Sequence, residues 1–168
     1  MATEAWLNGP VEGVDPYLMP VAHALLQCRE DVAAAAASLD GEQLWARPAG
    51  AASIGFHIRH IAGSVDRLLT YARGEALSQD QLDAAAREAP AGPEQDPGAL
   101  VASVAAAVEA ALAQLRRTSR EALLQPREVG RKRLPSTTLG LLFHAAEHAQ
   151  RHTGQLVTTA KIVRAGVR

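Results

Sequence analysis

Three histidines recur at intervals of four residues near the C-terminus, at His144, His148 and His152. Four residues make slightly more than one turn of an α-helix, so these imidazoles would lie along one side of a helix. Two imidazoles one turn apart can bind the same metal ion. Leucines flank the row, and histidines beside a buried apolar face cost free energy unless their ring nitrogens find partners. The spacing therefore indicates a candidate metal site.

A second pair, His57 and His60, lies in the segment SIGFHIRHIAGS at residues 53–64, so five of the six histidines fall in two short segments. A single histidine or an isolated pair is more often an ordinary core or surface feature than a metal ligand. Two clusters favour the metal interpretation, in which two helices face each other and three histidines meet around one divalent ion. His23 has no histidine neighbour at helical spacing, so we expect it to be structural.

The composition describes the scaffold that must position these side chains. The chain has 168 residues, of which 48% are hydrophobic and only 4% aromatic. This length suits one domain spanning residues 1–168, and alanine-rich apolar stripes favour close-packed helices over sheet. The formal net charge of −1 gives no electrostatic footprint for nucleic acid. We interpret the short basic segment at residues 127–133 as an exposed connector.

Cys28 is the only cysteine, which excludes a disulfide framework within the chain and fits a reducing cytoplasm. The first residues lack the basic and apolar regions of a signal peptide, and no apolar run approaches the roughly 20 residues that a membrane span needs. We therefore expect a cytoplasmic protein that binds neither membrane nor nucleic acid, with Cys28 as a small buried side chain.

Apolar residues at helical spacing predict four long amphipathic helices, at residues 16–40, 53–73, 97–118 and 137–166. Each begins at a residue suited to the N-cap, namely Asp15, Ser53, Asp96, and Ser136 or Thr137. The connections at residues 41–52, 75–96 and 119–135 are interpreted as loops, the second with a short helix capped by Ser78. No strand signal is present, so the sequence predicts an all-α four-helix bundle with long crossover connections.

The second predicted helix carries an inward face and two glycines. Its inward positions, on spacing, are Phe56 or His57, His60, Ile61, Ser64, Leu68 and Tyr71. Gly55 and Gly63 each cost about 1 kcal/mol relative to alanine in a helix, and glycine is tolerated where a neighbouring backbone or a ligand comes close. This helix must lie next to the helix of the histidine row for a metal site to form, which the sequence alone does not require.

The segment around His60, followed after a long gap by HAQRHTGQL from His148, resembles the DinB/YfiT-like family of metalloenzymes. In that family a four-helix bundle holds a divalent metal on three histidines, one from the second helix and an i, i+4 pair from the fourth. A Gly-Gln dipeptide follows the pair closely, as Gly154 and Gln155 do here. The architecture that the resemblance implies spans most of the chain, whereas the matching motifs lie in the two histidine segments.

This resemblance assigns roles to particular side chains. The implied metal ligands are His60, His148 and His152. By spacing, His144 with His148 is a competing pair, which the position of the Gly-Gln dipeptide disfavours. Two candidate catalytic residues lie nearby: His57 could act as a general base or orient a ligand, and Gln155 could hydrogen-bond a ligand or a metal-bound water.

Three neutral imidazoles leave a coordination position open, as in catalytic sites. A zinc-type ion there lowers the pKa of a bound water to near 7, or holds a thiolate for attack. The family includes hydrolase-like members and enzymes that transfer low-molecular-weight thiols such as bacillithiol or mycothiol, which implies a hydrolase or thiol S-transferase acting on a small electrophile. We favour zinc, with nickel, iron and manganese as alternatives. The family often forms homodimers, so we expect one here. The alternative function is a non-catalytic bundle for binding or dimerisation with a vestigial metal site.

Overall fold

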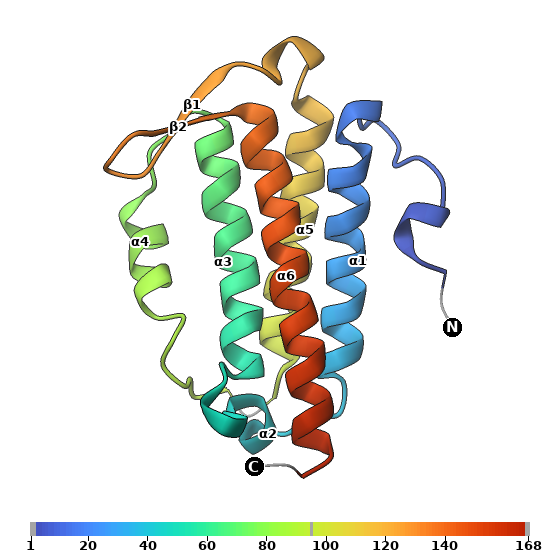
Figure 1. Cartoon of the computed structure of the whole chain (residues 1–168), viewed down its shortest axis with the longest axis vertical. Coiled ribbons are helices and arrows are strands. Elements are labelled where there is room, and N and C mark those ends of the chain that lie inside the picture. The colour runs from blue at the N-terminus through green and yellow to red at the C-terminus, as the bar shows by residue number, and fades with distance from the viewer. Residues whose placement is uncertain (1–2, 95, 167–168) are drawn as a thin grey trace.

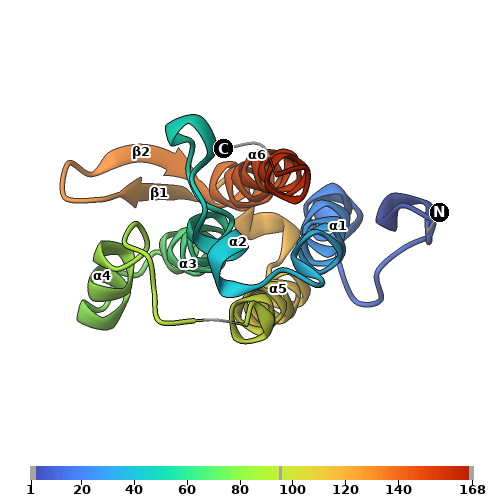
Figure 2. The same ribbon diagram turned by 90° about the horizontal axis from the view of Figure 1, so that it is seen from below.

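The computed structural model describes residues 3–94 and 96–166, and its centre is a bundle of four long helices (Figure 1). These are α1 (Met19–Ala36), α3 (Ile54–Ala72), α5 (Gly98–Arg117) and α6 (Thr138–Arg164). Seen from below, α3 packs against both α5 and α6, and α1 closes the bundle against the same two helices (Figure 2). The predicted all-α four-helix bundle is confirmed, and the helices that carry the histidine clusters, α3 and α6, are neighbours.

Two helices start at the side-chain caps that the sequence predicted. Ser53 and Thr137 each accept a hydrogen bond from the backbone N–H three residues later, at 3.2 and 3.0 Å. Asp15 caps a single 3₁₀ turn, Pro16–Leu18, and α1 begins only after this turn at Met19. The helix also ends before the predicted boundary at residue 40. The capping chemistry is therefore correct, while the bounds of the first helix are shifted.

The core fills the space between the four long helices. From α3 it takes five aliphatic side chains, each no more than 3% exposed: Ile54, Ile58, Ile61, Val65 and Leu69. Leu68 and Tyr71, predicted to face inward, are half-buried and pack against this core. Because α3 contacts two neighbouring helices, its buried surface is wider than one stripe. Cys28 is a free, buried cysteine, as predicted.

Short helices occupy two of the predicted loops. Helix α2 (Gly41–Trp45) packs against α3 at the lower end of the bundle in Figure 1, and α4 (Gln79–Ala86) flanks α3, capped by Ser78 as predicted. The remaining single 3₁₀ turns are Ala5–Leu7, Pro48–Gly50 and Arg120–Ala122. The connection from α3 to α5 thus runs along the side of α3, next to the histidine cluster of that helix.

A β-hairpin lies in the connection before α6, so the expectation of no strands is wrong. Strand β1 (Pro126–Val129) pairs antiparallel with β2 (Leu134–Thr137) (Figure 1). The turn between them uses Gly130 with φ of 68°, a left-handed conformation that suits glycine. Each strand has four residues with no buried position, which is too short for a period-two hydrophobic pattern to stand out in the sequence.

Helix α5 is unusually apolar. In the part of the chain that the structure describes, it is the one helix long and apolar enough to cross a membrane by length and composition. The expectation that no segment reaches this level is therefore wrong for α5, whose many alanines raise its mean hydropathy even at exposed positions. It packs against α1 and α3 within the bundle.

Candidate metal centre

Three imidazoles, from His60 on α3 and from His148 and His152 on α6, converge between the two helices. One nitrogen from each ring lies within 4.8 Å of the others. The Nε2 atoms of His60 and His148 are 2.8 Å apart, and the ring centroid of His152 lies 4.4 Å from that of His60 and 4.6 Å from that of His148. The adjacency of α3 and α6 therefore brings the three predicted ligands to one point.

The ring nitrogens of this cluster are available to a cation. Burial, followed by repulsion from His152 and His60, lowers the pKa of His148 to about 4. Burial and the nearby His60 also lower the pKa of His152. These two rings are therefore neutral at pH 7, and each has one unprotonated nitrogen that can bind a metal in place of its present hydrogen-bond partner. The buried Nδ1 of His148, on the side of the ring away from His60, has no hydrogen-bond partner among the described residues. A set of three half-buried imidazoles is a donor set that zinc and related divalent metals accept.

His57 contacts this cluster from the side. Its side chain is buried, and its Nδ1 lies 3.0 Å from Nδ1 of His152. Burial, then repulsion from His152 and His60, lowers its pKa to about 4. With both rings neutral, one nitrogen of this pair carries the hydrogen and the other accepts it. The structure thus places His57 beside a candidate ligand rather than among the three converging rings.

His144 lies outside the cluster. Its side chain is 49% exposed, and its Nδ1 is 3.4 Å from a carboxylate oxygen of Glu147. Its ring centroid is 5.4 Å from that of His148, one turn towards the start of α6. His60 contacts both His148 and His152, and the group of described residues that could hold a metal includes these three histidines but not His144.

Gln155 is exposed and lines a cavity of about 650 Å³ together with His57, Arg151 and Thr158. This cavity opens beside the histidine cluster and runs along α6 towards its C-terminal end. Arg151 is paired with Glu147 at 2.5 Å. The cavity offers a small molecule access to the side of the cluster that His57 occupies.

Glu88 is a residue of the site that the sequence did not identify. It follows α4 in the connection to α5, and its Oε2 accepts a hydrogen bond from Nδ1 of His60 at 2.7 Å. Its other oxygen accepts one from Arg67 at 2.5 Å. Burial raises the pKa of this carboxyl group, but the hydrogen bonds from His60 and Arg67 outweigh burial and leave the pKa below its usual value. Glu88 is therefore ionised at neutral pH.

One sequence signal pointed towards this contact without naming the partner. Gly63, one turn after His60, was expected to mark a close approach. A Cβ atom at Gly63 would lie 2.4 Å from Oε1 of Glu88, so the carboxylate occupies the space that a side chain would take. At Gly55 the approaching group is the ring of Trp45, which would lie 2.5 Å from a Cβ atom at this position. Both glycines therefore admit a neighbouring side chain, not a backbone.

Arg59 on α3 forms hydrogen bonds with the chain segment that carries Glu88. Its guanidinium donates to the backbone oxygens of Arg87 and Pro90 at 3.2 and 3.0 Å, and to both carboxylate oxygens of Glu94 at 2.8 and 2.6 Å. It also lies 4.6 Å from the ring centroid of Trp45, whose indole N–H donates to the backbone oxygen of Glu94. The segment around Glu88 is thus tied to α3 on both sides.

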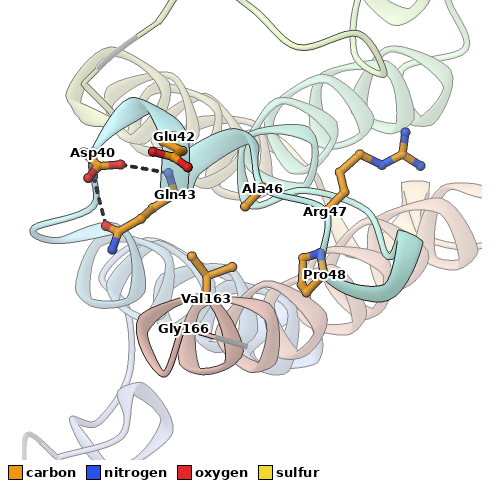
Figure 3. Close-up of a pocket in the computed structure, with 8 residues that line it drawn as sticks. All are labelled: Asp40, Glu42, Gln43, Ala46, Arg47, Pro48, Val163 and Gly166. Carbon is orange, nitrogen blue, oxygen red and sulfur yellow. Dashed lines mark hydrogen bonds between the residues drawn. The ribbon is translucent and has the colours of Figure 1, made fainter. Parts of the chain in front are cut away.

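Two other features lie apart from the centre. His23 is half-buried on α1 and bonds the backbone oxygen of Gly9 at 2.9 Å. A cavity of about 510 Å³ lies at the end of the bundle, between α2 and the last turn of α6 (Figure 3). Asp40 and Gln43 in its lining bond each other's backbone as a helix cap (Figure 3). Its lining, as far as the structure describes it, contains no histidine.

Two comparisons with known proteins match the fold of this chain. The family model of the DinB superfamily matches residues 24–156, a range that includes all three converging histidines. A crystal structure of a conserved protein from Enterococcus faecalis has the same fold, with a TM-score of 0.70 and 21% identity. The match covers 88% of this chain and 97% of the other. No curated protein matches the chain.

Proposed function

Because the chain belongs to the DinB superfamily, we propose that it is a metal-dependent enzyme that activates water or a low-molecular-weight thiol against a small electrophilic substrate. The observation that supports this most directly is the convergence of His60, His148 and His152 within 4.8 Å, in contact with His57, which lines a cavity. Three protein ligands leave a position for water or thiol, which is the pattern of catalytic rather than structural zinc sites.

The metal would be held by His60, His148 and His152, and we favour zinc, with nickel, iron and manganese as alternatives. When bound, such an ion supplies Lewis acidity, which makes a water or thiol a nucleophile near neutral pH. The lowered pKa of His148 keeps this ring unprotonated, so protons do not compete with the metal for it at pH 7.

His57 is proposed to orient His152 and to face the substrate. Since Nδ1 of His152 points at Nδ1 of His57, the free Nε2 of His152 is the nitrogen available to the metal. His152 then carries its hydrogen on Nδ1 and donates it to His57, whose own hydrogen is on Nε2. In this state His57 is a hydrogen-bond donor towards the cavity that it lines, and its Nδ1 is already occupied.

Gln155 is proposed to bind the substrate. Its exposed amide lines the same cavity as His57 and carries both a donor and an acceptor for a polar group. The volume of about 650 Å³ falls in the range of small-molecule sites. The expected partner is therefore a small molecule, with a low-molecular-weight thiol as second substrate in a transferase reaction.

A cytoplasmic homodimer that binds neither nucleic acid nor membrane completes the proposal. The homodimer is proposed because members of this family often form one; on α6, Phe143 is 61% exposed and Ile162 is 37% exposed. Sedimentation of the untagged protein would measure the subunit number.

The alternative function is a non-catalytic binding or dimerisation module with a vestigial metal site. Stoichiometric metal without turnover over a broad panel of electrophiles, with and without thiols, would favour that alternative.

The central experiment compares two histidine variants of α6. Protein purified without an affinity tag is analysed for metal, and His148→Ala is compared with His144→Ala, which removes an exposed imidazole one turn away. We expect His148→Ala to lose the metal and His144→Ala to keep it. Full metal occupancy and affinity in His148→Ala would show that the assigned ligands are wrong. Turnover with and without candidate thiols then separates hydrolysis from thiol transfer.

A further inference from the structure

We propose that Glu88 is a positioning residue of the metal centre: it fixes the ring orientation and the protonated nitrogen of His60. The connection between α3 and α5 would then be a functional part of the site. This inference rests on the proposed function, because it assumes that His60 is a ligand. Glu88 does not contact the metal position or the substrate cavity in this role and acts only through His60.

The hydrogen bond between the two residues has one possible direction. Arg67 donates to one oxygen of Glu88 at 2.5 Å, and a carboxylate paired with a guanidinium accepts hydrogen bonds, so Nδ1 of His60, 2.7 Å from the other oxygen, carries the hydrogen. Nε2 of His60 is then unprotonated, and this is the atom that faces Nε2 of His148 at 2.8 Å. An imidazole that donates one N–H to a carboxylate presents its other nitrogen to a metal in the required state. Glu88 therefore selects the tautomer of His60 that binds a cation.

Glu88 is held so that it cannot turn away from His60. The residue is only 8% exposed, and Arg67, four positions after Gly63 on α3, donates to its second oxygen at 2.5 Å. Both carboxylate oxygens are thus used, one for each partner. A simple surface ion pair between Glu88 and Arg67 would not need burial or contact with a histidine.

The backbone of α3 makes room for this carboxylate. A Cβ atom at Gly63 would lie 2.4 Å from Oε1 of Glu88 and 2.7 Å from a guanidinium nitrogen of Arg67. Helix α3 therefore keeps a glycine in its interior, at a cost of about 1 kcal/mol in helix stability, at the position where the carboxylate reaches His60. The ties from Arg59 to Arg87, Pro90 and Glu94 hold the connecting segment around this contact.

The test is the near-isosteric change Glu88→Gln, compared with Glu147→Gln. Glu147 is a carboxylate beside His148 on α6, but it bonds Arg151 and faces no nitrogen of the three ligands. The control therefore removes an equal charge near the site without touching His60. We expect Glu88→Gln to weaken Zn²⁺ affinity, measured by chelator competition, by about 10- to 100-fold, and Glu147→Gln to change it less than threefold. Equal effects of the two variants would overturn the proposal.

A second measurement does not depend on metal. Nitrogen-15 NMR of the metal-free protein at pH 7.5 identifies the protonated ring nitrogen of His60. We expect Nδ1–H in the unaltered protein. In Glu88→Gln, Arg67 can only donate and so attracts the amide oxygen, which turns the amide NH₂ towards His60 and moves the ring hydrogen to Nε2. A wild-type His60 with its hydrogen on Nε2, or an unchanged tautomer in Glu88→Gln, would overturn the proposal.

These results can be told apart from failure of the proposed function. If His148→Ala keeps its metal, the ligand assignment fails whatever Glu88 does. If His148→Ala loses its metal while Glu88→Gln keeps normal affinity, only the positioning role of Glu88 fails. The tautomer of His60 is read without any metal and therefore tests the contact itself in either case.

Discussion

The Nδ1 atom of His57 on α3 lies 3.0 Å from the Nδ1 atom of His152 on α6. This contact joins the sequence-predicted catalytic histidine to a sequence-predicted ligand, across the same pair of helices that forms the metal centre. Glu88 stands in the corresponding relation to His60. Two of the three candidate ligands thus have a partner for the nitrogen that would not bind the metal, while the buried Nδ1 of His148 has none among the described residues.

The first prediction concerns His57. His57→Leu removes the acceptor for His152 Nδ1–H, so we expect metal affinity to fall by about tenfold or more, in the range found when such partners of ligands are removed. His144→Leu, which alters an exposed histidine on α6, is the matched control and should leave affinity unchanged. Chelator competition with Zn²⁺ measures both. Unaltered affinity in His57→Leu would leave His57 without an orienting role.

The second prediction is a pH dependence of stability in the metal-free protein. The pKa values of His57 and His148 fall from 6.5 to about 4 on folding. Between about pH 6.5 and pH 4 the unfolded chain binds protons at these rings that the folded chain does not, so the free energy of unfolding decreases as the pH falls through this window. Above it, these two rings contribute no pH dependence.

Urea unfolding at intervals between pH 7.5 and pH 4.5 checks this dependence. The double variant His57→Gln, His148→Gln should show a flatter profile, since glutamine does not titrate. Most carboxylates titrate below this window, so they add little to the difference between the two proteins. A wild-type profile as flat as that of the double variant would contradict the lowered pKa values.

The third prediction compares two glycines in long helices. Gly55→Ala places a Cβ atom 2.5 Å from the Trp45 ring, and we expect it to destabilise the protein by about 1–3 kcal/mol, as overpacking does. Gly154→Ala meets nothing within 4 Å on α6 and should stabilise the protein by about 0.5–1 kcal/mol through helix propensity. Thermal and urea unfolding give both values. Stabilisation by Gly55→Ala would mean that Trp45 does not pack against α3.

Features with a local origin were predictable from the sequence. The i, i+4 spacing of His148 and His152 places both rings on one side of α6 wherever that helix lies. The caps at Ser53, Ser78 and Thr137 also depend only on residues within one turn. For these features the residues that decide the structure are close neighbours in the chain, so a single sequence contains the necessary information.

Features that depend on distant residues were not predictable. Glu88 reaches His60 across 28 positions, and Trp45 reaches Glu94 across 49. Nothing in the periodicity of either segment indicates its partner, and the two glycines of α3 revealed only that something would come close. The hairpin was missed because its strands are short and largely exposed.

The two sides of the metal centre are far apart in the chain, since His60 and His148 are separated by 88 positions. An ion bound between them would act as a cross-link between the middle and last thirds of the polypeptide, without any disulfide. Departure of α6 from the bundle would then require release of the ion. Local opening between α3 and α6 should therefore become rarer as the metal concentration rises. Slower amide hydrogen exchange along both helices would show this.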